Sequence, residues 1–320
     1  MMSKHSTPPG RIDVEVQGKV LIARIDGGPL AELGPEVAVA LSELMDRVED
    51  NPDIRAVVLT GTHPGRFISH ANIPWMNDGG RKALPVGRGI SSILARLASV
   101  FRLGPTLSPG WSRVPFAGVV QLDQLHHTFL RMNRSGAIFI AALNGSAQGI
   151  GSELVQACDV RLMAGGDFFI GQFEILIGFN PGGGGTQRLS RLVGPHRALR
   201  LMLEGRPVKP AEALEIGLVD EVLPADQLLQ RAVALGDYLG SRPSLAVEAV
   251  KRSVYFGASL PLVQGLHLEP AEMISLLTKQ QAQALMADYI RGTEQNGELP
   301  LYVPETYAAA LASGSFASQR

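Results

Sequence analysis

The pattern of apolar and polar positions predicts a chain in which strands and helices alternate. Strands are predicted at residues 14–16, 20–23, 56–60, 137–143, 160–163 and 168–170, where runs are short and either alternating or rich in β-branched side chains. A helix is predicted over residues 35–48, because apolar side chains recur at helical spacing and Pro35 stands at the start, where its missing N–H does no harm. Strands that alternate with helices indicate an α/β core.

The C-terminal half is predicted to be mostly helical. Helices are expected over about residues 187–204, 210–216, 225–240, 244–257 and 264–291. The pattern therefore divides the chain into a flexible N-terminus (1–11), a core (12–224), a helical region (225–297) and a loosely held tail (298–320) rich in small residues.

Composition narrows the class of protein. The 320 residues are 45% apolar and 18% charged with a formal net charge of -1, so a large core is expected and nothing favours binding to nucleic acid. The single cysteine, Cys158, excludes an internal disulfide and favours a reducing compartment. The N-terminus has no apolar signal core and the longest apolar run, residues 137–143, is too short to cross a bilayer, which predicts a cytoplasmic protein with no membrane partner.

Candidate chemistry is concentrated between Asn144 and Arg188. Two glutamates, Glu153 and Glu174, each stand in a glycine-rich frame, NGSAQGIGSEL and IGQFEILIGFNPGGGGTQRL. Two carboxylates carried by sharply bending backbone are suited to moving protons at neighbouring carbons. The alternatives are that Glu153 only stabilises the dipole of a helix start and that Glu174 is a surface carboxylate.

Four segments, taken in order, resemble the crotonase (enoyl-CoA hydratase/isomerase) superfamily. They are VVLTG and RFISHANI within 57–73, NG, GIGSEL and CD within 144–159, PGGGGTQRL at 181–189, and GR with AEALEIGLVD within 205–220. The likeness runs from about Val14 to Pro224. It implies an α/β crotonase-like (ClpP/crotonase) spiral of ββα units with a helical C-terminal trimerisation region, assembled as a homotrimer or a dimer of trimers.

One interval departs from the resemblance. Residues within about 77–135 exceed the shorter, mostly helical segment of related chains, and residues 103–111 form a loop rich in Pro, Gly and Ser. We predict that this insertion is a lid or spacer over the active site or a contact between subunits; the alternative is a disordered surface loop.

The resemblance assigns roles to individual residues. Glu153 and Glu174 are implied to be catalytic, and the backbone N–H groups of Ala71 and Ile150 to form an oxyanion hole for a thioester. Ile150 also stands where a glycine-rich turn enters a helix, so its N–H is free by position. Contacts to substrate or CoA are implied for Ser69, His70, Asn72 and Ile73.

The expected activity is reversible addition of water to a 2-enoyl-CoA, with CoA as part of the substrate and no metal or other cofactor. The alternatives are an enoyl-CoA isomerase or another acyl-CoA lyase, and a non-catalytic acyl-CoA-binding or scaffold subunit. Related chains often carry a basic residue that contacts CoA where this chain has Asp26-Gly27-Gly28, and its loss favours the scaffold subunit. The presence of both glutamates favours hydration. The run Gly182–Gly185 lacks the Lys-Ser/Thr of a phosphate loop, and His126 and His127 diverge on a helix, which disfavours a metal pair.

Overall fold

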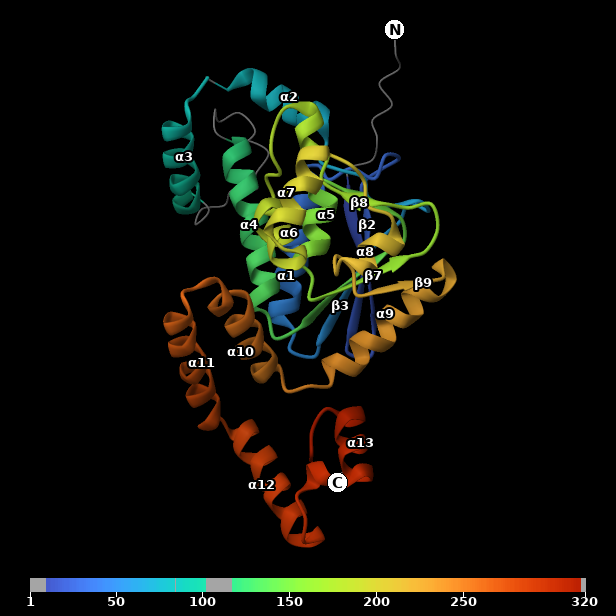
Figure 1. Ribbon diagram of the computed structural model, residues 1–320, viewed down its shortest axis with the longest axis vertical. Helices are drawn as coiled ribbons and strands as arrows, with labels where there is room; N and C mark the ends of the chain where they lie inside the picture. The colour runs from blue at the N-terminus through green and yellow to red at the C-terminus, as the bar shows by residue number, and fades with distance from the viewer. Residues whose placement is uncertain (1–9, 84, 102–116, 318–320) are drawn as a thin grey trace.

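The computed structural model describes residues 10–83, 85–101 and 117–317 (Figure 1). Its main sheet has six strands in the order β1-β2-β3-β5-β7-β9, and only the β1–β2 pair is antiparallel. These strands are β1 (Arg11–Gln17), β2 (Val20–Asp26), β3 (Ala56–Gly61), β5 (Ile138–Leu143), β7 (Val160–Ala164) and β9 (Glu221–Leu223). The predicted α/β core is confirmed. Residues 1–9 of the predicted flexible N-terminus (1–11) and the loop 103–111 lie outside the described residues, whereas Arg11 already belongs to β1.

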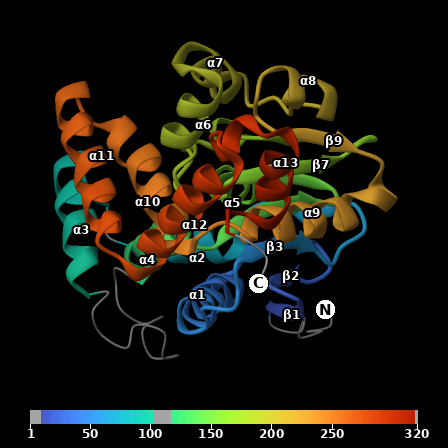
Figure 2. The ribbon, with the colours of Figure 1, turned by 90° about the horizontal axis from the view of Figure 1, so that it is seen from below.

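Helices cover both faces of the main sheet, which is why its central strands are apolar throughout. Helix α9 (Ala225–Gly240) packs Leu228 and Ala232 against one face, and α1 (Pro35–Asp50) lies on the other with α4 (Ala117–Arg134) (Figure 2). Successive residues of β3 and β5 therefore point into two separate cores, and both strands are buried along almost their whole length. Burial on both faces is the normal situation of a parallel sheet.

A second, three-stranded parallel sheet positions the candidate site. It consists of β4 (Arg66–Ile68), β6 (Ser146–Gln148) and β8 (Ile170–Gly171), each of which follows one strand of the main sheet. The same strand-strand-helix step therefore recurs along the chain, as the predicted ββα units require. The predicted strand at 168–170 is wrong in its bounds, because the pairing covers only Ile170 and Gly171.

Two predicted helices are each divided in the structure. The predicted helix 187–204 is two, α6 (Gly185–Val193) and α7 (Pro195–Glu204), because Gly194 adopts a positive φ of 84° before Pro195. The predicted helix 264–291 is also two, α11 (Leu262–Leu277) and α12 (Gln280–Asn296). The remaining helices and turns are α2 (Ile73–Lys82), α3 (Arg88–Phe101), α5 (Ile150–Ala157), η2 (Glu174–Ile177), α8 (Pro210–Glu215), α10 (Ser244–Tyr255), η3 (Gly257–Ser259), η4 (Pro300–Tyr302) and α13 (Pro304–Ser313).

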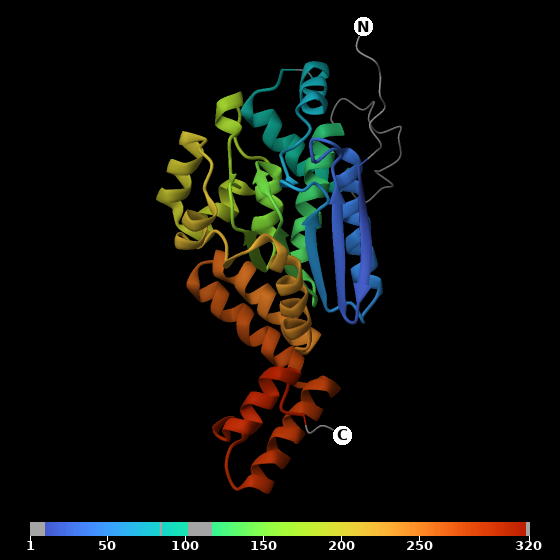
Figure 3. The ribbon, with the colours of Figure 1, turned by 90° about the vertical axis from the view of Figure 1, so that its right-hand side faces the viewer.

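The C-terminal helices leave the body of the protein and form an arm (Figures 1 and 3). Helix α10 is fixed to the core by Asp159, whose carboxylate accepts from Lys251 Nζ at 2.7 Å and from the Tyr255 hydroxyl at 3.0 Å. Helix α13 lies in the tail, where the sequence predicted no element, and Phe316 beyond it packs edge-on against Tyr289 of α12. Among the described helices, none combines the length and the apolarity that a membrane crossing requires.

Candidate active site

Glu153 lies one turn into α5 and is held by backbone donors from a distant loop. Its side chain is enclosed, since the residue is 1% exposed. The Gly183 N–H donates to both carboxylate oxygens at 2.9 Å, and the Gly185 N–H donates to Oε1 at 2.6 Å. Donors of this kind stabilise the ionised carboxylate and fix its orientation.

Glycine at position 183 leaves room for this contact. A Cβ atom added at Gly183 would lie 2.1 Å from Ile150 Cδ1 and 2.5 Å from Glu153 Oε2, so a larger residue would displace the ends of both side chains. The methyl group of Ile150 and the Glu153 carboxylate thus crowd the same point of the turn. The run serves close backbone packing, which the sequence favoured over a phosphate loop.

Glu174 reaches the same region from another element. It opens the 3₁₀ turn η2 just after β8, and it is 6% exposed. A Cβ at Gly149, the turn residue before Ile150, would lie 2.9 Å from Glu174 Oε1. The Glu174 carboxylate therefore lies against the start of the helix that carries Glu153, so the structure brings the two predicted glutamates together.

Burial makes both carboxyl groups reluctant to ionise. Burial raises the pKa of Glu153 to about 7, the backbone donors at Gly185 and Gly183 lower it, and the charge of Glu174 raises it. The pKa of Glu174 is also raised, mainly by burial. A carboxyl group with a pKa near neutrality can both accept and release a proton during turnover.

Gln172 binds Glu174 and was not found from the sequence. With its amide nitrogen turned toward Glu174, it donates to Oε1 at 2.9 Å and to Oε2 at 3.1 Å, while its oxygen accepts from Gln156 at 3.2 Å. A Cβ at Gly185 would touch both the Gln172 amide and Glu153 Oε1. The sequence offered only a glutamine two residues before a candidate catalytic glutamate. The structure buries this amide, and a buried amide needs partners.

Both predicted oxyanion-hole N–H groups lack a protein acceptor within the described residues. The isolated bridge between Leu33 and Ala71 uses the His70 carbonyl and the Asn72 N–H, which leaves the Ala71 N–H unused. Ile150 is the first residue of α5, and its N–H makes no hydrogen bond to any described residue. Strands β4 and β6 pair in parallel, so the segments that carry the two groups run side by side.

The other predicted substrate contacts have several structural roles. The Ser69 hydroxyl donates to the Leu30 carbonyl at 2.7 Å. Asn72 is the N-cap of α2, with Oδ1 accepting from the Trp75 N–H at 2.8 Å, and Ile73 begins that helix. The polar atoms of Ser69 and Asn72 thus bind protein groups. His70 Nδ1 lies 2.7 Å from the Ala71 carbonyl oxygen, and its ring packs against Phe173 and lines a cavity of about 290 Å³.

Comparison with known proteins identifies the family. The profile described as "Enoyl-CoA hydratase/isomerase" matches residues 90–294, more than half of the chain. The chain belongs to the enoyl-CoA hydratase/isomerase family.

Individual family members are similar along most of their length. A short-chain-enoyl-CoA hydratase of Clostridium acetobutylicum is 27% identical over 285 residues, covering 89% of this chain and 96% of that protein. Another, of Clostridioides difficile, is 37% identical over 155 residues, covering 48% of this chain and 98% of that protein. The crystal structure of an enoyl-CoA hydratase from Geobacillus kaustophilus superposes with a TM-score of 0.70 at 26% identity, covering 89% of this chain and 96% of that one. The predicted crotonase fold is confirmed.

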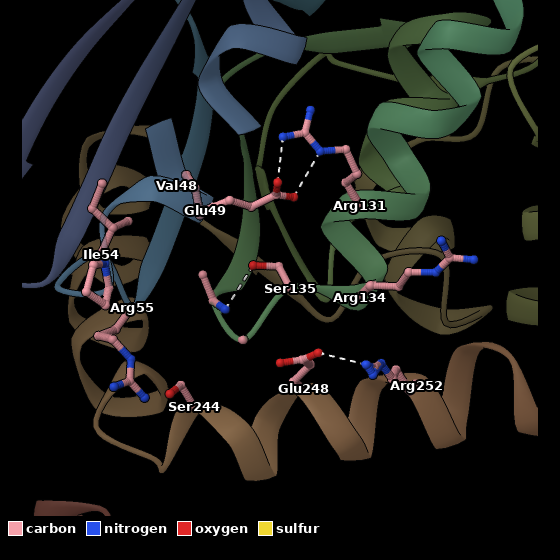
Figure 4. A pocket seen from close by; sticks show the side chains of 13 residues that line it. Val48, Glu49, Ile54, Arg55, Arg131, Arg134, Ser135, Ser244, Glu248 and Arg252 are labelled. Carbon is pink, nitrogen blue, oxygen red and sulfur yellow. Dashed lines mark hydrogen bonds and ion pairs between the residues drawn. The ribbon is translucent and has the colours of Figure 1, made fainter. Parts of the chain in front are cut away.

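A second cavity, larger than the one beside His70, lies away from the glutamates. It measures about 420 Å³ and is enclosed by α1, α4 and α10 near the amino ends of β3 and β5 (Figure 4). Its charged side chains largely pair with each other, since Arg131 binds Glu49 at 2.7 Å and Arg252 binds Glu248 at 3.0 Å. Paired charges at the opposite end of the strands give this cavity no part in the chemistry of Glu153 and Glu174.

The structure also shows what metal ligands and thiols the described residues offer. Within them, no three His, Cys, Asp or Glu side chains are grouped as a metal site would need. Cys158 is buried among apolar side chains, and burial raises the pKa of its thiol. A thiol that resists ionisation is a poor nucleophile.

Proposed function

We propose that this protein catalyses the reversible addition of water across the C2–C3 double bond of a 2-enoyl-CoA. The observation that carries the proposal is the convergence of two buried glutamates beside two backbone N–H groups without protein acceptors. The two bacterial relatives, which are named short-chain-enoyl-CoA hydratases, support the same reaction.

In this proposal the N–H groups of Ala71 and Ile150 bind the thioester oxygen. When the oxygen of water adds to C3, negative charge moves through C2 onto the thioester oxygen, and the thioester becomes an enolate. Two N–H dipoles aimed at the oxygen stabilise this charge more than they stabilise the neutral thioester, and so they lower the barrier. Ile150 contributes the helix N-terminus as well, whose partial positive charge acts in the same direction.

The two glutamates move the protons. Glu153 is the base in this assignment, because the donors at Gly183 and Gly185 favour its ionised form. It takes one proton from the water that adds to C3, while Glu174, whose raised pKa keeps a neutral fraction available, gives a proton to C2. The product gains the elements of one water molecule, and the glutamates exchange protonation states.

Hydratase activity is directly measurable. We expect the purified protein to bleach the absorbance of the conjugated enoyl thioester with at least one member of a panel of short, medium, long and aromatic 2-enoyl-CoA substrates. The product should be the 3-hydroxyacyl-CoA, which mass spectrometry identifies by the gain of one water. Folded protein that bleaches none of the panel would disprove the proposed function.

We propose a trimer or a dimer of trimers as the active assembly. Helix α11 has no buried residue although it is rich in apolar side chains; the exposed ones are Leu262, Val263, Leu266, Met273, Ile274 and Leu277. An apolar helix face of this kind is typical of a subunit contact. Light scattering at micromolar concentration should give a mass of three or six chains, and a clean monomer would contradict the proposal.

A further inference from the structure

We infer that His126 is a positioning residue for Glu153 and acts through the peptide group between Gly182 and Gly183. The inference rests on the proposed function, in which Glu153 is the base. It gives a role to one member of a histidine pair that the sequence disfavoured only as a metal site.

Two linked hydrogen bonds connect an imidazole, a peptide group and a carboxylate. His126 Nε2 lies 2.6 Å from the Gly182 carbonyl oxygen. A carbonyl oxygen only accepts, so Nε2 carries the hydrogen and donates it. The same planar peptide group ends in the Gly183 N–H, which donates to both oxygens of Glu153 at 2.9 Å.

Helix α4 packs over the glycine turn with two side chains, one turn of the helix apart. Leu122, one turn before His126, lies 3.8 Å from where a Cβ of Gly182 would stand. The two positions are four residues apart and therefore share a face of the helix. His126 supplies the polar contact of this face, and Leu122 supplies the apolar one.

The turn needs such a contact because its own residues restrain it weakly. Glycine backbone is permissive, and Gly184 adopts a positive φ of 113°. Gly183 carries no side chain that would restrict its backbone, and one added there would push against Ile150 and Glu153. A hydrogen bond at the Gly182 carbonyl holds the peptide plane toward Glu153 and polarises its N–H, since linked hydrogen bonds strengthen each other.

The electrostatic consequence concerns the ionised form of Glu153. The charged groups that act on this carboxyl are Glu174 from η2, which raises its pKa, and Arg188 from α6, which lowers it. The Gly183 N–H also lowers it. If the peptide is released from His126, that donor weakens and the pKa of Glu153 rises. The pH below which the base is protonated then moves upward.

The test compares His126→Leu with His126→Gln in the full-length chain. Glutamine places its Nε2 donor close to the position of the imidazole Nε2, whereas leucine keeps bulk without a donor. His196→Leu, on the exposed start of α7, is the matched control. Circular dichroism and light scattering establish that each variant folds and assembles as the wild type does.

We expect His126→Leu to lower kcat by about tenfold, the effect of losing one hydrogen bond, with little change in KM. The acid limb of its profile of kcat against pH should move to higher pH. His126→Gln should restore both the wild-type rate and the wild-type position of that limb. An unchanged rate and pH profile in His126→Leu would overturn the inference, as would a His126→Gln variant as impaired as the leucine variant.

A second readout does not depend on turnover and separates this inference from the proposed function. With ¹³C-labelled glutamate carboxyls, and Glu153→Gln used for assignment, the Glu153 signal should titrate at higher pH in His126→Leu than in the wild type. An equal titration in the two proteins would overturn the inference whether or not any enoyl-CoA is hydrated. Absence of hydration by the wild type would instead refute the proposed function alone.

Discussion

Glu153→Gln is expected to lower the turnover of enoyl-CoA hydration by ~10²–10⁴-fold, the usual effect of losing a general acid or base. Glutamine keeps the size of the side chain, and its oxygen can still accept from Gly183 or Gly185. It cannot take a proton from water. Its amide nitrogen would also face a backbone donor, so some loss of stability is expected along with the loss of rate. Steady-state kinetics on the preferred 2-enoyl-CoA measures the effect.

Glu174→Gln is expected to cause a loss of similar size, because the second proton has no other source in the proposed reaction. Glu43→Gln, at an exposed position of α1, is the control and should retain wild-type turnover. Near wild-type rates in both active-site variants would contradict the roles assigned here. If only one variant lost activity, the result would favour an isomerase, which shifts a double bond with a single carboxyl group.

The pH dependence follows from the same pair. Burial raises the pKa of Glu153 to about 7, so its base form is lost as the pH falls through that value. The hydration rate should therefore decrease on the acid side of neutrality. The decrease in rate on the alkaline side is assigned to Glu174, which must be protonated to give a proton to C2. Because the two groups interact, the observed values belong to the pair.

The elements that could be predicted from the sequence are those with a local signal. The strand at 56–60 is a run of β-branched residues that must be buried on both faces, and the structure places β3 there. Strands β4, β6 and β8 have only two or three residues, which is too short for alternation to show. They form because the preceding strands of the main sheet deliver them side by side, and that is a long-range effect.

The same limit applies to the site. Glu153 and Glu174 were predicted because each stands in a glycine-rich frame that bends the backbone. His126 has no such frame, and Gln172 shares the frame of Glu174 without any sign of its role. Both roles depend on what lies across the fold. His126 meets Gly182 over a sequence separation of 56 residues, so no local pattern could indicate the contact.

Ala71→Pro is expected to reduce turnover by ~10²–10³-fold, since loss of one oxyanion-hole donor costs roughly 3–4 kcal/mol of transition-state stabilisation. The structure makes this variant informative. The bridge to Leu33 uses the groups on either side, so removing the Ala71 N–H breaks no protein hydrogen bond among the described residues. Proline also fixes φ and restricts His70, so circular dichroism must show that the variant folds.

Ile150→Ala is the matched control for the other donor. It keeps the backbone N–H and removes only the side chain that packs beside Gly183, so it should retain most of the wild-type turnover. Binding of a CoA thioester should remain measurable by calorimetry in both variants, because the oxyanion hole acts mainly on the transition state. Undiminished turnover in a folded Ala71→Pro protein would remove Ala71 from the mechanism. The enolate would then lack one of its two donors, and the support for thioester chemistry at this site would rest on Ile150 and the glutamates alone.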